Sequence, residues 1–335
     1  MRLGLIGLGR VGSFHAETLT ALPEVSSLVV TDAAPGVATA VADRLGAEAV
    51  DTPEELIASG VDGVVIAAAT DAHPALLLAA AKAGLPIFCE KPLAGTITDG
   101  LDVARRLAET GVAVQVGYPR RFDPGFAATR EAVVSGDLGW VHTVRSTTHD
   151  PAPPPREYLA RSGGIFRDCS VHDFDAVRWV TGREVVSVYA SGSSRGDAMF
   201  EELGDVATAA TLLTLDDDIR ALISNTRYNP RGHDVRLEVH GSGDSIAAGL
   251  EDQLPLRSVE PNASFPAGTP HVFFMDRFTP AFRAELTTFT DLVAGRRSSP
   301  CTAEDALETS WVAEAATLSL AQDRPVALDE IRERL

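Results

Sequence analysis

The first third of the chain alternates between two hydrophobic patterns. Short apolar runs typical of buried strands are each followed by a longer segment in which apolar residues recur at helical spacing. This alternation with short connections predicts an α/β domain with a doubly wound parallel sheet. Ligands of such sheets bind at the carboxyl ends of the strands, so residues there are the first candidates for function. The predicted strands lie in residues 2–9, 25–32, 60–69, 85–92 and 112–118, and the helices in 11–22, 36–47, 74–84 and 98–111.

Beyond about Arg121 the pattern changes. A helix near 126–136 and a strand at 140–150 precede a loop rich in proline and glycine at 151–164. Loops of that length in compact domains are often functional. A helix at 171–182 follows, then strands joined by turns, which predicts a C-terminal α+β domain with an open, largely antiparallel sheet. These strands lie in 185–192, 206–215, 219–226 and 234–243, and the closing helices in 280–295 and 303–323.

Length and composition are consistent with two globular domains, which the change of pattern places at residues 1–120 and 121–335. The net charge of −18 argues against nucleic acid or an anionic membrane surface as partner. The three cysteines show no metal-ligand spacing, so no metal site is expected, and their odd number argues against a disulfide framework. The chain has neither a secretory signal pattern nor an apolar run of about 18 residues, and we expect a reduced, cytoplasmic protein.

The first predicted strand ends in the segment GLGRVG. Gly7 allows a tight turn, Gly9 lets the backbone approach a pyrophosphate, and Gly12 lets the helix pack closely on the strand. The phosphates would lie at the N-terminus of the following helix, where free N–H groups and the helix dipole favour an anion. The segment predicts a dinucleotide site in a Rossmann domain, with a glycine-rich turn without a ligand as the alternative. The predicted cofactor-binding residues of this segment are Gly7, Gly9, Arg10, Val11 and Gly12.

Asp32 ends the second predicted strand, 20 residues after Gly12. A carboxylate at that position hydrogen-bonds the adenosine ribose hydroxyls of NAD and repels the 2′-phosphate of NADP. No arginine adjoins Asp32, so NAD is favoured over NADP. In the alternative interpretation, Asp32 only caps the following turn.

The exit of the third predicted strand adds further candidates at the same edge of the sheet. Ala69, Thr70 and His73 follow the strand and are predicted to lie beside the cofactor. Asp71 fits the cap of the next helix equally well, because Pro74 would occupy its first turn. For His73, contact with the cofactor and contact with a neighbouring loop both remain open.

The fourth predicted strand is apolar but ends in Glu90–Lys91–Pro92. Charged side chains rarely lie in a core unless they are paired. At the ligand edge of the sheet, however, Lys91 can point into a cleft, donate a hydrogen bond to a substrate hydroxyl and favour its developing alkoxide. Glu90 can pair with Lys91 or face the nicotinamide end of the cofactor.

Asp168 and His172 stand four residues apart after a glycine pair. On a helix this spacing brings both side chains to one face. A carboxylate beside an imidazole sets its tautomer and stabilises its charged form, so His172 is a candidate general base. A helix N-terminus also attracts acidic residues without any chemistry, and the spacing alone leaves that alternative open.

The glycine segment, the sequence TDAH from Thr70 and the EKP after the fourth strand resemble the Gfo/Idh/MocA oxidoreductase family. Within that family the chain is most similar to inositol 2-dehydrogenases. The resemblance runs from Arg2 to about Leu328, and its most specific parts are FCEKPLA, VQVGYPRRFDPGF and the aspartate–histidine segment.

The resemblance implies a catalytic set of Lys91, Asp168 and His172 and an NAD-dependent oxidation of a secondary hydroxyl. His172 would take the hydroxyl proton, Lys91 would position the hydroxyl and Asp168 would orient the base. The implied substrate contacts are Lys91, Arg120, His149, Asp168, His172 and His233, and the implied cofactor contacts also include Glu90 and Lys91. A surface ion pair is the alternative for Arg120 and its neighbour Arg121.

One departure from the inositol dehydrogenases affects the substrate. His233 stands where those enzymes can carry a tyrosine, so the substrate is either an inositol, another cyclic polyol, or a sugar oxidised at a secondary hydroxyl or at its anomeric carbon. A catalytically silent NAD- and sugar-binding regulator of the same fold is a further alternative. An open sheet needs its second face covered, and similar proteins pair that face with another subunit, so a homodimer or homotetramer is expected.

Overall fold

The computed structural model describes residues 1–334 and divides into two compact units. Unit 1 comprises Met1–Pro119 and Phe282–Glu308, and unit 2 comprises Arg120–Ala281 and the chain from Thr309 on. The first boundary between the units follows Pro119. The other two fall within two long helices, α10 (Phe274–Val293) and α11 (Ala303–Gln322). No helix among the described residues is both long and apolar enough to cross a membrane.

The division differs from the sequence-based one at residues 282–308. The sequence places this segment in the second domain, whereas the structure includes it in unit 1. The reason is apolar packing, because Leu286 and Phe289 of α10 join the same buried cluster as Leu3 and Phe88. Contacts between segments so far apart in sequence are invisible to a pattern of local periodicity.

Unit 1 contains a parallel sheet of six strands in the order β3-β2-β1-β4-β5-β6. The strand order reverses direction beside β1, as in dinucleotide-binding folds, and confirms the predicted doubly wound sheet. The strands are β1 (Arg2–Ile6), β2 (Ser27–Thr31), β3 (Glu48–Ala49), β4 (Gly63–Ile66), β5 (Ile87–Glu90) and β6 (Val114–Gly117). Strand β3 has two residues, too few to form a recognisable hydrophobic run, and the sequence does not predict it.

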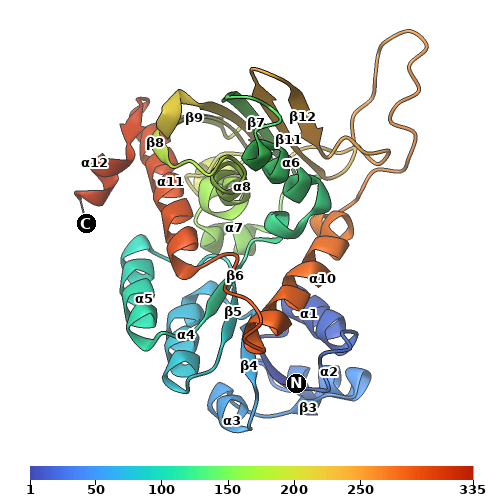
Figure 1. Cartoon of the computed structure of the whole chain (residues 1–335), viewed down its shortest axis with the longest axis vertical. Helices are drawn as coiled ribbons and strands as arrows, with labels where there is room; N and C mark the ends of the chain where they lie inside the picture. Colours follow the sequence, from blue (N-terminus) through green and yellow to red (C-terminus); the bar gives the residue numbers. More distant parts are fainter. Residues whose placement is uncertain (335) are drawn as a thin grey trace. The chain divides into compact units, whose positions relative to one another are not determined.

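Helices connect the strands of this sheet, and Figure 1 shows α4 beside β4 and β5, with α5 next to α4. Threonine side chains cap two of the helices, Thr52 before α3 and Thr96 before α5. The sequence does not predict α3, which spans less than two turns. The helices are α1 (Arg10–Thr20), α2 (Val37–Leu45), α3 (Pro53–Ala58), the short 3₁₀ turn η1 (Thr70–Ala72), α4 (His73–Lys82) and α5 (Ile97–Thr110).

Unit 2 contains a sheet of seven strands in the order β12-β11-β7-β10-β9-β8-β13. Only β7 and β10 pair in parallel, so the predicted open, largely antiparallel sheet is confirmed. The strands are β7 (Val141–His149), β8 (Val185–Ser193), β9 (Thr208–Leu215), β10 (Arg220–Thr226), β11 (Asp234–Gly241), β12 (Ser245–Ala248) and β13 (Val326–Ala327).

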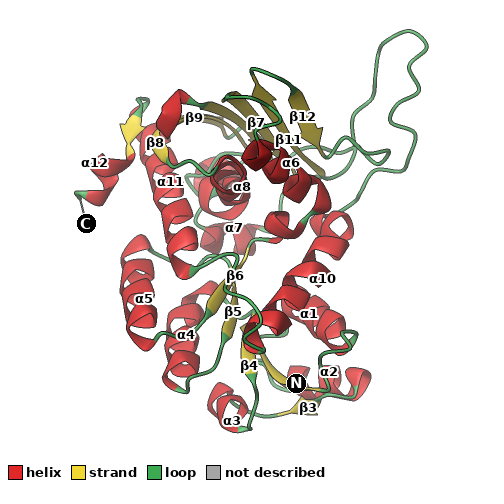
Figure 2. Ribbon diagram, viewed as in Figure 1, coloured by secondary structure: helices red, strands yellow, loops and turns green. Residues whose placement is uncertain are grey.

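The helices of unit 2 depart from the prediction in four places. The proline-rich segment contains α7, α10 begins at Phe274, earlier than its predicted start, and the short helices α9 and α12 are not predicted. Figure 2 shows the connection from β12 to α10 as a long loop. The helical elements are η2 (Pro119–Phe122), α6 (Pro124–Ser135), α7 (Arg156–Ser162), the π-helical turn η3 (Phe166–Ser170), α8 (Val171–Thr181), α9 (Met199–Glu202), η4 (Asp216–Asp218) and α12 (Leu328–Arg332).

One face of the unit 2 sheet is exposed and carries apolar side chains. Tyr189 of β8 pairs in register with Leu212 of β9, which pairs with Leu222 of β10. These three side chains form a row across the sheet and are 38%, 40% and 46% exposed. Their neighbours in sequence point inward and are buried, which is the alternation expected of a sheet covered on one side.

Candidate active site

The glycine segment after β1 forms an open cradle in front of helix α1. Gly7 has a φ of +91°, which favours glycine, and a Cβ at Gly12 would lie 2.0 Å from the carbonyl oxygen of Gly7. A Cβ at Gly9 would meet no atom within 4 Å. Gly9 is also the N-cap of α1, and no side chain caps this helix. The N–H groups of the first turn and the free space at Gly9 therefore suit a pyrophosphate.

The Asp32 carboxylate follows β2 and braces this cradle. Its Oδ2 accepts a hydrogen bond from the backbone N–H of Leu8 at 2.6 Å, and its Oδ1 accepts one from Ala34 at 2.8 Å. The second bond is the turn cap that was the alternative to a ribose contact. Each carboxylate oxygen can accept more than one hydrogen bond, so Asp32 keeps capacity for ribose hydroxyls. The residues of unit 1 thus fit a bound NAD.

A pair of alanine variants separates cofactor binding from folding at this cradle. We expect Gly9→Ala to unfold at the wild-type temperature but to bind NAD roughly 10–100-fold more weakly, because its methyl group occupies the space of the phosphates. Gly12→Ala should lower the unfolding temperature itself, since its methyl group overlaps the Gly7 carbonyl. Calorimetric titration with NAD and thermal unfolding measure the two effects, and wild-type NAD affinity in Gly9→Ala would contradict the assignment.

The exits of β4 and β5 are joined by a buried histidine. His73 is 1% exposed, with its Nδ1 2.8 Å from the carbonyl oxygen of Pro92 and its Nε2 3.1 Å from that of Ala68. The contact with a neighbouring loop, one of the two alternatives from sequence, is thus present. Ala69 is the N-cap of η1 and Thr70 is its first residue. Their contact with a cofactor stays a prediction.

The charged end of β5 has a partner that the sequence analysis missed. The Oε1 of Glu90 lies 2.6 Å from the Nε2 of His15, a fully buried residue of α1. A Cβ at Gly117 of β6 would lie 3.1 Å from Glu90 Oε2, so the absence of a side chain there leaves room for the carboxylate. The contact of Glu90 with His15 therefore connects helix α1 to strand β5, which Lys91 directly follows. The Lys91–Pro92 peptide bond is cis, and Lys91 is half-buried.

In unit 2, Asp168 lies in the π-helical turn η3 and His172 in the first turn of α8. Turns with the wider i→i+5 pattern are frequent at functional sites. The hydroxyl of Tyr158 donates to Asp168 Oδ1 at 2.7 Å, and Nη2 of Arg227 donates to Oδ2 at 2.7 Å. The carboxylate of Asp168 is thus held at both oxygens, and His172 follows it four residues later.

The polar chain continues from Arg227 toward His233. Nη1 of Arg227 donates to Asp150 Oδ2 at 3.0 Å, and Nδ1 of His233 lies 3.3 Å from Asp150 Oδ1. Burial acts to raise the pKa of Asp150, but the nearby His233 and Arg227 outweigh it and hold this pKa below its ordinary value. His233 is buried against the rings of Phe274 and Phe278.

Arg120 is not in a surface ion pair. It is 3% exposed, and its guanidinium donates to Asp173 Oδ1 at 2.7 Å and to Thr148 Oγ1 at 2.6 Å. Ser146 and Asn225 donate to the same carboxylate. Arg120 is thus part of a buried polar network that includes Asp173, the residue directly after His172. Its contact with substrate stays a prediction.

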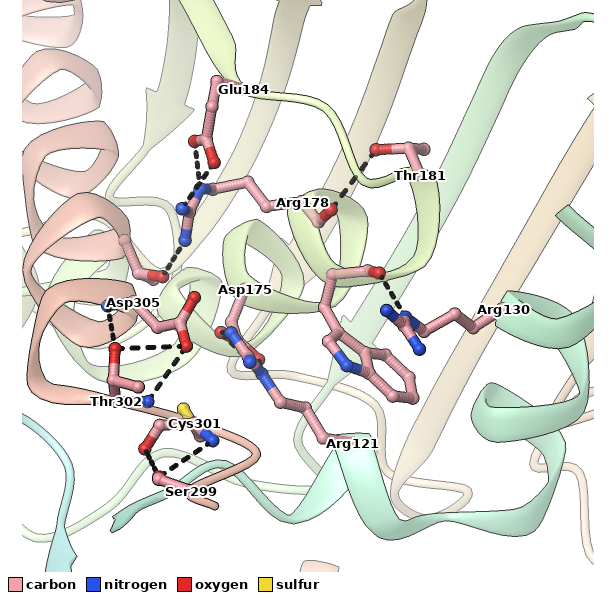
Figure 3. A network of polar contacts seen from close by, with 12 residues as sticks. Arg121, Arg130, Asp175, Arg178, Thr181, Glu184, Ser299, Cys301, Thr302 and Asp305 are labelled. Carbon is pink, nitrogen blue, oxygen red and sulfur yellow. Dashed lines mark hydrogen bonds and ion pairs between the residues drawn. The ribbon is translucent and has the colours of Figure 1, made fainter. Parts of the chain in front are cut away.

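The neighbouring Arg121 makes a second buried ion pair, with Asp175 of α8 (Figure 3). Figure 3 also shows Arg178 of the same helix paired with Glu184.

At the end of β7, His149 has its Nε2 2.9 Å from Ser224 Oγ, and burial lowers the pKa of His149. A neutral imidazole at this position can accept a hydrogen bond from a hydroxyl group, as the prediction of a substrate contact requires.

All three cysteines are buried free thiols. Burial raises the pKa of Cys89 and of Cys169. Within residues 1–334, no group of three or more histidine, cysteine, aspartate or glutamate side chains is placed to hold a metal ion.

The parallel sheet with its reversal of strand order, the glycine cradle and the carboxylate after β2 define the class: a dinucleotide-binding α/β protein. Two family sequence models match the chain. Residues 1–118 match the oxidoreductase family with an NAD-binding Rossmann fold, and residues 126–247 match the GFO/IDH/MocA C-terminal domain. The chain belongs to the Gfo/Idh/MocA family of oxidoreductases, and NAD is its cofactor.

Relatives match the chain over almost its full length. It is 35% identical to an inositol 2-dehydrogenase of Rhizobium meliloti, over 98% of this chain and 99% of the relative. It is also 35% identical to a myo-inositol 2-dehydrogenase of Thermotoga maritima, over 99% of each chain. A scyllo-inositol dehydrogenase of Lactobacillus casei, solved with NAD(H) and scyllo-inositol, is 27% identical and superposes with a TM-score of 0.88 over 98% of this chain and 99% of that one. The family and fold class predicted from sequence are confirmed.

Proposed function

We propose that this oxidoreductase uses NAD to oxidise a secondary hydroxyl group of a cyclic polyol, with an inositol as the first candidate. The open glycine cradle before the uncapped helix α1 carries the proposal, in a chain similar to inositol dehydrogenases from end to end. The three residues of the implied catalytic set, Lys91, Asp168 and His172, support the same reaction.

The proposed chemistry divides between these side chains. NAD, held by the glycine cradle and Asp32, supplies the hydride acceptor at C4 of its nicotinamide. His172 takes the hydroxyl proton as a hydride leaves the same carbon, which turns the alcohol into a ketone. Lys91 donates a hydrogen bond to that oxygen and stabilises its negative charge. Asp168 orients the imidazole and stabilises its charged form.

Substrate recognition is proposed for the polar side chains of unit 2. Neutral His149 can accept a hydrogen bond from one ring hydroxyl of the substrate. His233, which lies beside Asp150, can form a hydrogen bond with a second ring hydroxyl. Arg120 would act from within its network with Asp173. With Lys91, Asp168 and His172 these residues form the proposed substrate set.

The test is turnover with a panel of substrates. Purified enzyme with NAD is offered myo-inositol, scyllo-inositol, other inositols and common aldoses, and NADH formation is followed by absorbance. We expect at least one inositol to reduce NAD, with NADP a poorer acceptor because Asp32 repels its 2′-phosphate.

Two outcomes would reject the proposal. NAD binding without turnover of any inositol or aldose would favour the silent regulator. Turnover restricted to aldoses, with a lactone as product, would favour oxidation at the anomeric carbon.

We also propose that the exposed face of the unit 2 sheet pairs with a second copy of the chain, in a homodimer or homotetramer. The apolar row of Tyr189, Leu212 and Leu222 supports this, because such rows are normally covered. A monomer at micromolar concentration by light scattering would contradict it.

A further inference from the structure

Arg227 is a buried cation placed between two carboxylates. It directly follows strand β10, and its side chain is 4% exposed. Its backbone N–H donates to the carbonyl of Ala207 at 2.8 Å, which fixes the start of the side chain. Its two terminal nitrogens bind different partners. Nη2 donates a hydrogen bond to Asp168, and Nη1 donates one to Asp150. The charge of a buried guanidinium must be compensated by nearby groups, and both carboxylate partners supply the opposite charge.

The contact with Asp168 is oriented as well as charged. Arg227 holds Oδ2 of this carboxylate and Tyr158 holds Oδ1, each at 2.7 Å. With a donor held on each oxygen, the carboxylate plane cannot rotate without breaking a hydrogen bond. A guanidinium within hydrogen-bond distance also favours the ionised form of a carboxylate.

We infer that Arg227 is a positioning residue that holds Asp168 ionised and oriented for its work on His172. The inference rests on the proposed function, in which Asp168 orients the base. Arg227 touches neither cofactor nor substrate in this scheme and acts through Asp168. The titratable and charged groups near Asp168 include Tyr158 of α7, Cys169 of the same turn, His172 and Asp173 of α8, and Asp150 and His233 beyond Arg227.

Two substitutions separate charge from orientation. Arg227→Gln removes both, so we expect kcat to fall about 100-fold and the acid limb of the pH profile to move to higher pH, because Asp168 then binds protons more readily. Arg227→Lys keeps the charge but loses the planar fork, so the pH profile should return toward that of the wild type while part of the kcat loss remains. The KM for NAD should stay within about twofold of the wild-type value.

Arg178→Gln is the matched control. Arg178 is 6% exposed, pairs with Glu184 in the same unit and has no place in the proposed reaction. Its loss should lower stability but leave kcat and the pH profile unchanged. The kinetics of the variants are measured on the inositol that the wild type turns over best, and thermal unfolding of each variant is recorded.

The outcomes are distinct. Wild-type kcat and pH profile in a folded Arg227→Gln would overturn the role of Arg227 alone. Absence of wild-type turnover would reject the proposed function and this role with it. If both Arg227 variants failed to fold while Arg178→Gln folded, Arg227 would be a stability residue, and the inference would be overturned.

Discussion

Replacing Lys91 by methionine is expected to lower kcat/KM for the polyol by about 10²–10³-fold while the protein still folds and binds NAD. Methionine keeps much of the length and the apolar stem of lysine but removes the ammonium group. The oxygen of the reacting hydroxyl then loses the donor that stabilises its charge in the transition state. Initial rates of NADH formation, with calorimetric titration of NAD in parallel, measure both parts of the expectation.

The chain offers a natural control for this variant. Lysine occurs at only two positions in the sequence, 82 and 91, and the other 27 of its 29 lysine and arginine residues are arginine. Lys82 is exposed at the end of α4, so Lys82→Met should retain wild-type kinetics. Lys91→Arg should remain poor, because a guanidinium differs in size and geometry from an ammonium. Wild-type turnover by Lys91→Met would remove Lys91 from the mechanism.

Replacing Arg121 by leucine is expected to destabilise unit 2 by about 3–5 kcal/mol. Nε of Arg121 lies 3.0 Å from Asp175 Oδ2, and Nη2 lies 2.6 Å from Oδ1. The two side chains are only 4% and 1% exposed, so the single variant leaves a buried carboxylate without its cation. Trp140, Trp179 and Trp311 all belong to unit 2, so tryptophan fluorescence in urea reports on this unit.

The double variant Arg121→Leu/Asp175→Leu tests the origin of that loss. Removing both charges leaves neither member of this ion pair buried without its opposite charge, so the double variant should recover much of the stability. Arg105→Leu on α5 is the exposed control and should cost less than about 1 kcal/mol, because its ion pair with Asp102 is exposed to solvent. A double variant less stable than the single one would show that packing, and not charge, dominates at this pair.

The sequence predicts unit 1 well because its signals are local. Alternating apolar runs and helical periods place β1, β2, β4, β5 and β6 near their observed positions. The glycine cradle is also predictable, because each glycine is required by the conformation or close packing of backbone within a few residues of it. The φ of +91° at Gly7 and the contact between Gly12 and Gly7 are such local requirements.

The missed features depend on contacts between distant segments. In the sequence His15 is one more residue of an amphipathic helix, whereas its pairing with Glu90 joins positions 75 residues apart. A histidine on the buried face of that helix was the available signal. Arg227 carries no local signal of its role, since no residue near it in sequence indicates a contact with Asp168 or Asp150. Residues 282–308 joined unit 1 for the same reason.

The class of fold, the family and the candidate catalytic groups can all be predicted from the sequence alone, because periodicity, glycine positions and short motifs involve neighbouring residues. The partners of those groups emerge only when the chain is folded. The tertiary structure pairs Glu90 with His15, Arg120 with Asp173 and Asp168 with Arg227. A buried charge must find an opposite charge or a donor, and which one it finds depends on how the chain packs.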